Sequence, residues 1–167
     1  MSTHVQNFKC WYPDILGGLY TNGHAGFVIL MVAFPLLERY LREKSGVHEG
    51  SLNSQKNQFY TELRRVFPTL PDDSKAAQFW QVYRNGLLHQ VTLSQKNWKG
   101  LQVPDGWVSK HSQAVEIDSS GDFWVHPVEF AKAVIQTIEA DFTTFEGQHS
   151  VNHPLPVAHG TGATGPA

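Results

Sequence analysis

The feature that most constrains the fold is an apolar run with helical spacing, "GFVILMVAFPLL", from Gly26 to Leu37. At 12 residues it is too short to span a bilayer and is typical of a buried core helix. We expect this helix to run from about Asn22 to Gly46, with a kink at Pro35, because proline removes a backbone donor. The residues that share its apolar face by their three- and four-residue spacing are Phe27, Leu30, Phe34, Leu37 and Leu41. Two i, i+4 pairs are spaced to form ion pairs on its exposed side: Glu38 with Arg42, and Arg39 with Glu43.

Three further segments have the periodicity of amphipathic helices. The last of them begins at a proline, which is favoured at the first position of a helix, and the others are bounded by proline or by a capping aspartate. These helices are expected from about Ser54 to Phe67, from Asp72 or Asp73 to at least His89, and from Pro127 to Gly147. Four amphipathic helices indicate a helical bundle.

Helical periodicity stops between the third and fourth helices, from about residue 91 to residue 126. Here "AVEID" and "DFWV" flank a polar Ser-Ser-Gly turn and predict a short β-hairpin. The tryptophans of this segment, Trp98, Trp107 and Trp124, are expected to cover a small core, with stacking on unpaired RNA bases as the alternative. The chain is therefore predicted to be one mainly α domain, residues 1–146, with a small β-hairpin insertion.

The segments at the two ends lack such patterns. The stretch "ILGGLYTNGHAG" (Ile15–Gly26) carries several glycines without a phosphate-binding motif and is expected to be a flexible lead-in. Residues 147–167 are rich in Gly, Pro, Thr and Ala and are expected to form a disordered tail.

Composition narrows the class of protein. The single cysteine, Cys10, cannot form an internal disulfide or a cysteine-type zinc site and fits a reducing compartment. The nine histidines do not form a known zinc motif, so we expect no metal and no cofactor. With a net charge of −2 and no membrane-spanning run, the chain is predicted to be cytoplasmic.

The segment "FWQVYRNGLLHQ" (Phe79–Gln90) sets Arg84, Asn85 and His89 within an apolar helix. Histidine titrates near neutral pH and can take the proton of an attacking 2′-hydroxyl group. Arginine stays protonated and offers a planar fork of donors to a phosphate that gains negative charge. Asparagine can orient the backbone or a phosphate oxygen. These residue types suit cleavage of RNA without a metal ion.

"YRNGLLHQ" resembles the signature of the HEPN superfamily, helical domains named for their occurrence in higher eukaryotes and prokaryotes. The family pattern is an arginine, usually a polar residue after it, and a histidine after a gap of four to six residues. Arg84, Asn85 and His89 match it, and the resemblance in helix order covers roughly residues 20–146. It implies a four-helix bundle and a metal-independent endoribonuclease of the toxin or phage-defence type, with Arg84 and His89 as the catalytic pair and Asn85 in support. It also implies a homodimer with the site at its interface, RNA as the substrate, and an antitoxin or regulatory protein as a partner.

Two alternatives stay open. Five residues on a regular α-helix turn through about 500°, which leaves Arg84 and His89 roughly 140° apart. A distorted turn at Gly86, or a second chain, would have to bring them together.

In the structural alternative, Arg84 pairs with a carboxylate such as Glu38, and His89 caps the end of the helix. The functional alternative is a non-catalytic HEPN-like module for dimerisation or partner binding.

Overall fold

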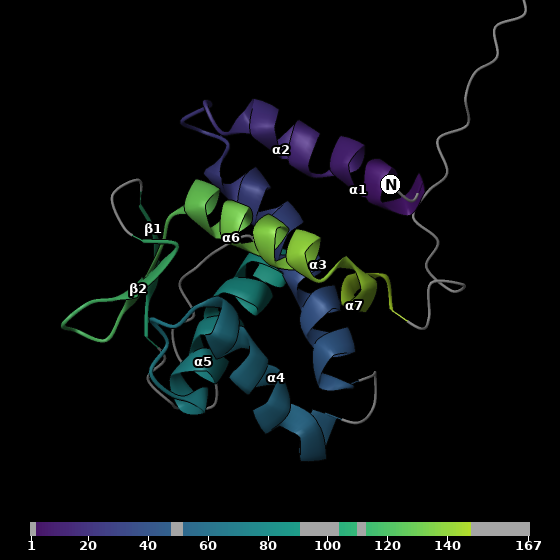
Figure 1. Ribbon diagram of the computed structural model, residues 1–167. Coiled ribbons are helices and arrows are strands. Elements are labelled where there is room, and N and C mark those ends of the chain that lie inside the picture. Colours follow the sequence, from purple (N-terminus) through teal and green to yellow (C-terminus); the bar gives the residue numbers. More distant parts are fainter. Residues whose placement is uncertain (1–2, 48–51, 91–103, 110–112, 148–167) are drawn as a thin grey trace, which may run out of the picture.

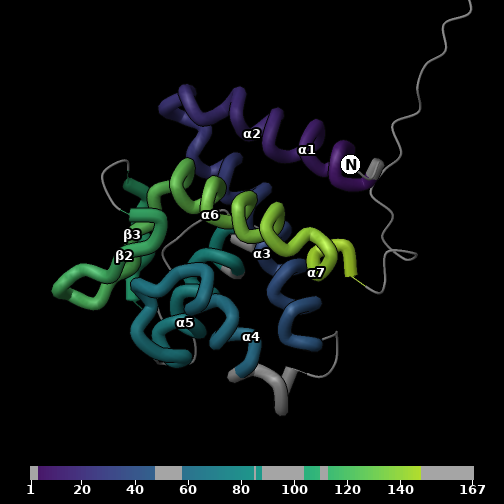
Figure 2. The backbone as a smooth tube through the Cα atoms, in the orientation of Figure 1, coloured from purple at the N-terminus to yellow at the C-terminus, as the bar shows by residue number. Residues whose placement is uncertain are grey.

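The computed structural model describes residues 3–47, 52–90, 104–109 and 113–147 (Figures 1 and 2), with the backbone alone for residues 3, 52–57, 85 and 88–90. The helices are α1 (Thr3–Trp11), α2 (Pro13–Leu19), α3 (Gly26–Ser45), α4 (Leu52–Val66), α5 (Asp73–Trp80), the π-helix η1 (Gln81–Gln90), α6 (Pro127–Ala140) and α7 (Phe142–Glu146). The strands are β1 (Gly106–Val108), β2 (Val115–Ile117) and β3 (Phe123–Val125). The described chain is mainly helical, as predicted.

Helix α3 is the centre of the molecule. It packs against α4, α6, α7 and η1. Figures 1 and 2 show α1 and α2 following one another along one side, α3 and α6 in the middle, and α4 and α5 on the opposite side. The small sheet lies at one end, next to the start of α6.

The core is built around the ring of Phe34 on α3. Its centroid lies 4.6 Å from that of Phe130 on α6 and 6.0 Å from that of Tyr83 on η1, both in stacked geometry. Phe79 and Trp80 of α5 complete the contact. Such aromatic pairs each contribute about 0.5–1.5 kcal/mol beyond the burial of their surface. The cluster therefore joins α3 and α6 to the continuous α5–η1 segment, which lies between them in sequence.

The predicted hairpin is confirmed. Strands β2 and β3 pair antiparallel, with Ile117 opposite Phe123, and the turn between them contains Gly121 at a φ of 87°. Strand β1 was not predicted. It pairs parallel to β3 and gives the sheet the order β1-β3-β2.

Tyr83 attaches this sheet to η1. Its buried hydroxyl group lies 2.7 Å from the carbonyl oxygen of Trp107 and 2.9 Å from that of Phe123, and it accepts a 3.0 Å hydrogen bond from the Trp107 N–H. The single hydroxyl proton serves one carbonyl at a time. One residue of the π-helix thus holds β1 and β3 together.

Local signals at the helix ends are confirmed. Asp72 caps α5, with its carboxylate accepting a 2.8 Å hydrogen bond from the Lys75 N–H. Pro127 is the first residue of α6. Gly46 ends α3 in the left-handed conformation, with a φ of 66°, which glycine adopts without steric cost.

The lead-in predicted for Ile15–Gly26 is wrong over its first part, because α2 continues to Leu19. Tertiary packing explains the helices α1 and α2. Leu16 is buried, and the ring of Phe8 lies 5.3 Å from that of Phe145. This burial offsets the low helix propensity of the two glycines in α2. Helix α3 begins only at Gly26, after the turn that follows α2.

The last predicted helix is divided in two at Asp141. The Asp141 carboxylate accepts hydrogen bonds from Lys44 Nζ at 2.6 Å, Thr144 Oγ1 at 2.8 Å and the Tyr40 hydroxyl group at 3.3 Å. These contacts hold Asp141 at a non-helical φ of −136°. Pro35, in contrast, is exposed and α3 continues through it.

Several predictions fall outside the described residues. These are the tail from residue 148 onward and the part of the insertion that contains Trp98. Within the described ranges, no helix is long and apolar enough to cross a membrane.

Replacing Tyr83 by phenylalanine tests the attachment of the sheet. Tyr83→Phe should lower the free energy of unfolding by about 1–3 kcal/mol, because the Trp107 N–H and a strand carbonyl lose their partner in a buried place. Urea unfolding followed by circular dichroism measures the change. Tyr60→Phe is the control, since its hydroxyl group makes no hydrogen bond within the described part of the chain. Equal stability of the two variants would contradict the anchoring role.

Candidate functional site

The Arg-Asn-His motif lies in a π-helix. Helix α5 passes into η1 at Gln81 without leaving helical backbone geometry, and η1 continues to Gln90. In a π-helix, the N–H of each residue bonds to the carbonyl five residues earlier. Backbone positions 84 and 89 therefore lie one turn apart on the same side of η1, instead of roughly 140° apart as on an α-helix. The geometric obstacle noted for the sequence is absent at the level of the backbone.

Gly86, where a distorted turn was one of the open alternatives, lies within the π-helix, which extends over the ten residues of η1. π-Helical turns are rare, are usually single turns, and occur frequently at functional sites. Asn85 and His89 belong to η1 by their backbone, whereas their side chains lie outside the described part of the structure.

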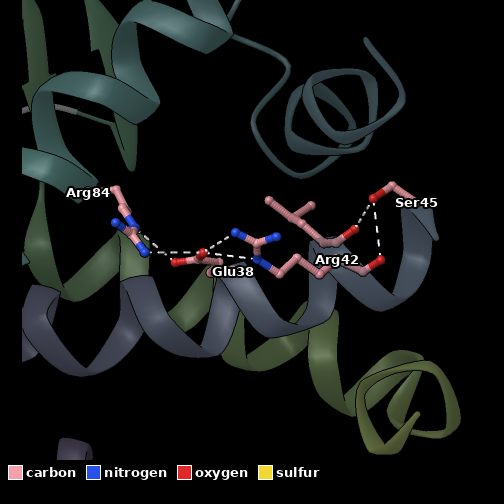
Figure 3. Close-up of polar contacts among 5 residues, drawn as sticks. Glu38, Arg42, Ser45 and Arg84 are labelled. Atoms are coloured by element: carbon pink, nitrogen blue, oxygen red, sulfur yellow. Dashed lines mark hydrogen bonds and ion pairs between the residues drawn. The ribbon is translucent and has the colours of Figure 1, made fainter. Parts of the chain in front are cut away.

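Arg84 is held by Glu38 of α3 in a two-point ion pair (Figure 3). Arg84 Nε donates to Glu38 Oε2 at 2.9 Å, and a terminal nitrogen donates to Oε1 at 3.3 Å. The Arg84 side chain is 27% exposed and that of Glu38 is 14% exposed. This pairing is the one that the structural alternative predicted for Arg84.

The same carboxylate also binds Arg42, one turn further along α3. Arg42 Nε and Nη2 donate to Glu38 Oε1 at 3.0 and 2.8 Å, as the i, i+4 spacing predicted. Figure 3 shows the two guanidinium groups converging on Glu38 from different helices. We refer to these three residues as the Arg84–Glu38–Arg42 cluster. Two guanidinium groups and one carboxylate give it a net charge of +1.

The other predicted pair on α3, Arg39 with Glu43, is wrong. Arg39 instead donates to the backbone carbonyl groups of Phe145 and Glu146, at 3.1 Å each, and lies over the Phe145 ring. Arg39 thus fixes the last helix to α3. Its role is structural. The Arg42 side chain, in contrast, donates only to Glu38 among the described residues.

The cluster keeps Glu38 ionised. Burial alone would raise the pKa of the Glu38 carboxyl group, but the hydrogen bonds from Arg84 and Arg42, with their positive charges, outweigh burial and lower it. Glu38 is therefore an anion at neutral pH and orients both arginine side chains. The sequence predicts the pair of Glu38 with Arg42 and allows the pair of Glu38 with Arg84. Only the packing of η1 on α3 shows that the two arginines bind the same carboxylate.

An exposed apolar face of α3 leads up to this cluster. Val28 is 52% exposed and Met31 is 40% exposed. Met31, the exposed Pro35 and Glu38 are spaced four and three residues apart and so share one side of the helix. Phe27, which was predicted to belong to the core, is 41% exposed. Contiguous exposed apolar side chains typically mark an interaction surface.

Trp107 and Trp124 do not cover a core, contrary to the prediction. They stack on each other on the outer face of the sheet, with centroids 5.6 Å apart and an angle of 22° between the rings. Their indole N–H groups donate to Asp122 at 3.5 Å and Asp118 at 2.9 Å. Carboxylates beside the rings make this face a poor one for a polyanion.

Comparisons with known proteins give no relatives: no protein-family model, curated protein or solved structure matches the chain. The resemblance to HEPN proteins therefore consists only of the motif and the expected order of the helices. Within residues 3–47, 52–90, 104–109 and 113–147, no group of three or more His, Cys, Asp or Glu side chains is arranged to hold a metal ion.

The pKa of Glu38 leads to a prediction for stability against pH. Because that pKa is lowered by folding, the cluster stabilises the protein fully above the ordinary value of 4.5, and the contribution is lost as the pH falls through the lowered pKa. Glu38→Gln should cost about 1–3 kcal/mol of unfolding free energy at neutral pH and reduce the loss of stability in acid.

Urea unfolding of wild type and Glu38→Gln at a series of pH values from about 7 to about 3 measures both effects. Glu116→Gln, at an exposed position on β2, is the matched control and should change neither quantity. A Glu38→Gln variant with the acid dependence of the wild type would show that the cluster does not hold the carboxylate as an anion.

Proposed function

We propose that this protein is an HEPN-like, metal-independent endoribonuclease of the toxin or defence type that acts as a homodimer. The observation that supports this most directly is the π-helical register, in which backbone positions 84 and 89 are closer together around the helix axis than on an α-helix. Residues with complementary chemistry, an arginine and a histidine, occupy those two positions. A π-helix in the family motif itself also agrees with the frequent use of such turns at functional sites.

In the proposed reaction, His89 removes the proton of a ribose 2′-hydroxyl group, whose oxygen attacks the adjacent phosphorus. The bond from phosphorus to the 5′-oxygen breaks, and that oxygen takes up a proton from a second acidic group. In a homodimer, each chain contributes one histidine, so one acts as the base and the other as the acid. The products are a 2′,3′-cyclic phosphate and a 5′-hydroxyl end.

Arg84 would stabilise the charge that develops on the phosphate oxygens. Its pairing with Glu38 is compatible with this role, because the two hydrogen bonds from Glu38 fix the plane of the guanidinium group. Partial burial strengthens the attraction between a cation and a phosphate by lowering the local dielectric constant. Asn85 is assigned a supporting role at the phosphate or the backbone.

The exposed apolar face around Val28 and Met31 supports dimerisation close to the site, since it lies on the side of α3 that carries Glu38. It equally favours a second candidate function, a non-catalytic HEPN-like module for dimerisation or partner binding. In that function, the ion pair of Arg84 with Glu38 is purely structural. An antitoxin or regulatory protein is a further proposed partner of the protein.

Cleavage assays distinguish the two functions. Wild type should cleave RNA in the presence of EDTA, and Arg84→Ala or His89→Ala should lower the rate at least about 100-fold, the usual scale for an acid–base or charge-stabilising group. Substrates of tRNA, mRNA and rRNA, with analysis of the product ends, cover the main RNA classes. Lys132→Ala removes a positive charge from α6 and is the control. Absence of wild-type cleavage would favour the non-catalytic module, and an activity abolished by EDTA would contradict the mechanism.

Introducing a charge on the apolar face tests dimerisation. Met31→Asp should shift the protein from dimer to monomer, because burying an unpaired carboxylate in an interface is strongly unfavourable. Sedimentation analysis measures the mass, and circular dichroism verifies the fold. Ile15→Asp, at a 60% exposed position on α2, is the control and should stay dimeric. A wild type that is monomeric at all concentrations would rule out the homodimer.

A further inference from the structure

The cluster brings two guanidinium groups from different helices to one oxygen atom. Arg42 Nη2 lies 2.8 Å from Glu38 Oε1, and Arg84 Nη2 lies 3.3 Å from the same atom. These two nitrogens are therefore at most about 6 Å apart, since each is bonded to the shared oxygen. In Figure 3 the side chains reach Glu38 from opposite sides along α3.

Two like charges at this separation repel each other, and the single carboxylate between them does not cancel both. The cluster keeps a net charge of +1 in a half-buried place, with the side chains of Arg42 and Arg84 26% and 27% exposed. A phosphodiester has one negative charge shared by two free oxygens, and guanidinium groups bind such oxygens through pairs of N–H donors. It would neutralise the remaining charge of the cluster.

Arg42 is suited to binding a phosphate because its side chain donates to no backbone carbonyl group among the described residues. Its nitrogen Nη1 is buried and has no hydrogen-bond partner within the described residues. Arg39 and Arg64 differ from it, because both donate to backbone carbonyl groups and so hold the fold together. An unpaired charged donor is unfavourable in a buried place, so the charge of the Arg42 guanidinium group is not fully compensated within the described residues.

We propose that Arg42 is a second phosphate-binding residue, which together with Arg84 binds one phosphodiester group of a single-stranded nucleic acid, and that Glu38 is the positioning residue for both. This inference rests on the proposed function in taking RNA as the substrate. It adds to the sequence motif a residue on a different helix, 42 positions before Arg84.

Binding is measured apart from cleavage with a 2′-O-methyl RNA oligonucleotide, which lacks the attacking hydroxyl group. Arg42→Ala and Arg84→Ala should each weaken binding about tenfold or more by fluorescence anisotropy in EDTA. Each should also lower the slope of log affinity against log salt by about 0.7, the value for one phosphate contact with a single strand. The double variant should lose at least about threefold less affinity than the product of the two single losses, because both residues bind one phosphate.

Arg42→Gln is a second variant that separates the loss of charge from a loss of folding. Its amide can still donate to Glu38, whereas the positive charge is removed. It should weaken binding to the same extent as Arg42→Ala. Lys132→Ala, which removes one charge from α6, should leave the salt slope within error of wild type. The proposal is overturned if Arg42→Gln and Arg42→Ala bind like Lys132→Ala, if the single losses multiply in the double variant, or if wild type does not bind.

The two proposals fail in different ways. If wild type cleaves RNA with dependence on Arg84 and His89 while the Arg42 variants bind normally, the ribonuclease stands and the role of Arg42 is wrong. If the Arg42 and Arg84 variants lose binding as expected but wild type never cleaves, the phosphate site stands and the ribonuclease is wrong.

Discussion

The stacking of Tyr83 on Phe34 is the contact on which the rest of the site depends. The two rings are nearly parallel, at 6° and 6.0 Å between centroids, and both residues are fully buried. This contact fixes how η1 lies on α3. One residue after Tyr83 comes Arg84, and one helical turn after Phe34 comes Glu38, so the ring contact in the core brings the next pair of side chains together at the surface. The ion pair is thus a consequence of core packing, which contributes more to stability than an ion pair does.

Tyr83 also fixes the position of η1 relative to the small sheet. Its ring faces the helical core, and its hydroxyl group holds β1 and β3. Each such hydrogen bond adds only about 1 kcal/mol net, but leaving buried backbone groups unpaired would cost more. The sheet and α3 therefore restrain η1 from two sides next to Arg84. A π-helix is a strained arrangement in comparison with an α-helix, and tertiary contacts of this kind can maintain it.

Features set by local sequence were predictable. The apolar spacing of α3, the cap at Asp72 and the start at Pro127 all depend on residues within one or two turns. Features set by distant residues were not. The break at Asp141 depends on Lys44, which lies 97 positions earlier, and β1 depends on parallel pairing with β3. The helices α1 and α2 depend on burial against the last helices, which outweighs the glycines that suggested a flexible segment.

The candidate site also combines features that could be predicted from the sequence with features that could not. The motif and both partners of Glu38 could be proposed from spacing and charge, but each pairing was an isolated possibility. The π-helix could not be predicted, because side-chain periodicity does not reveal a shift of the backbone hydrogen bonds from the fourth to the fifth residue. That shift decides whether positions 84 and 89 face the same way. Sequence alone therefore suggests candidate residues but not their geometry.

The ion pair of Arg84 does not by itself decide between a structural and a functional role. A structural pair needs one arginine and one carboxylate, and its net charge is zero. Here a second arginine binds the same oxygen, which leaves an excess positive charge in a half-buried place and a buried guanidinium nitrogen without a partner among the described residues. Burying excess charge is unfavourable for folding. An excess positive charge in a half-buried place is easier to understand if an anion binds there, and the proposed function takes that anion to be a phosphate.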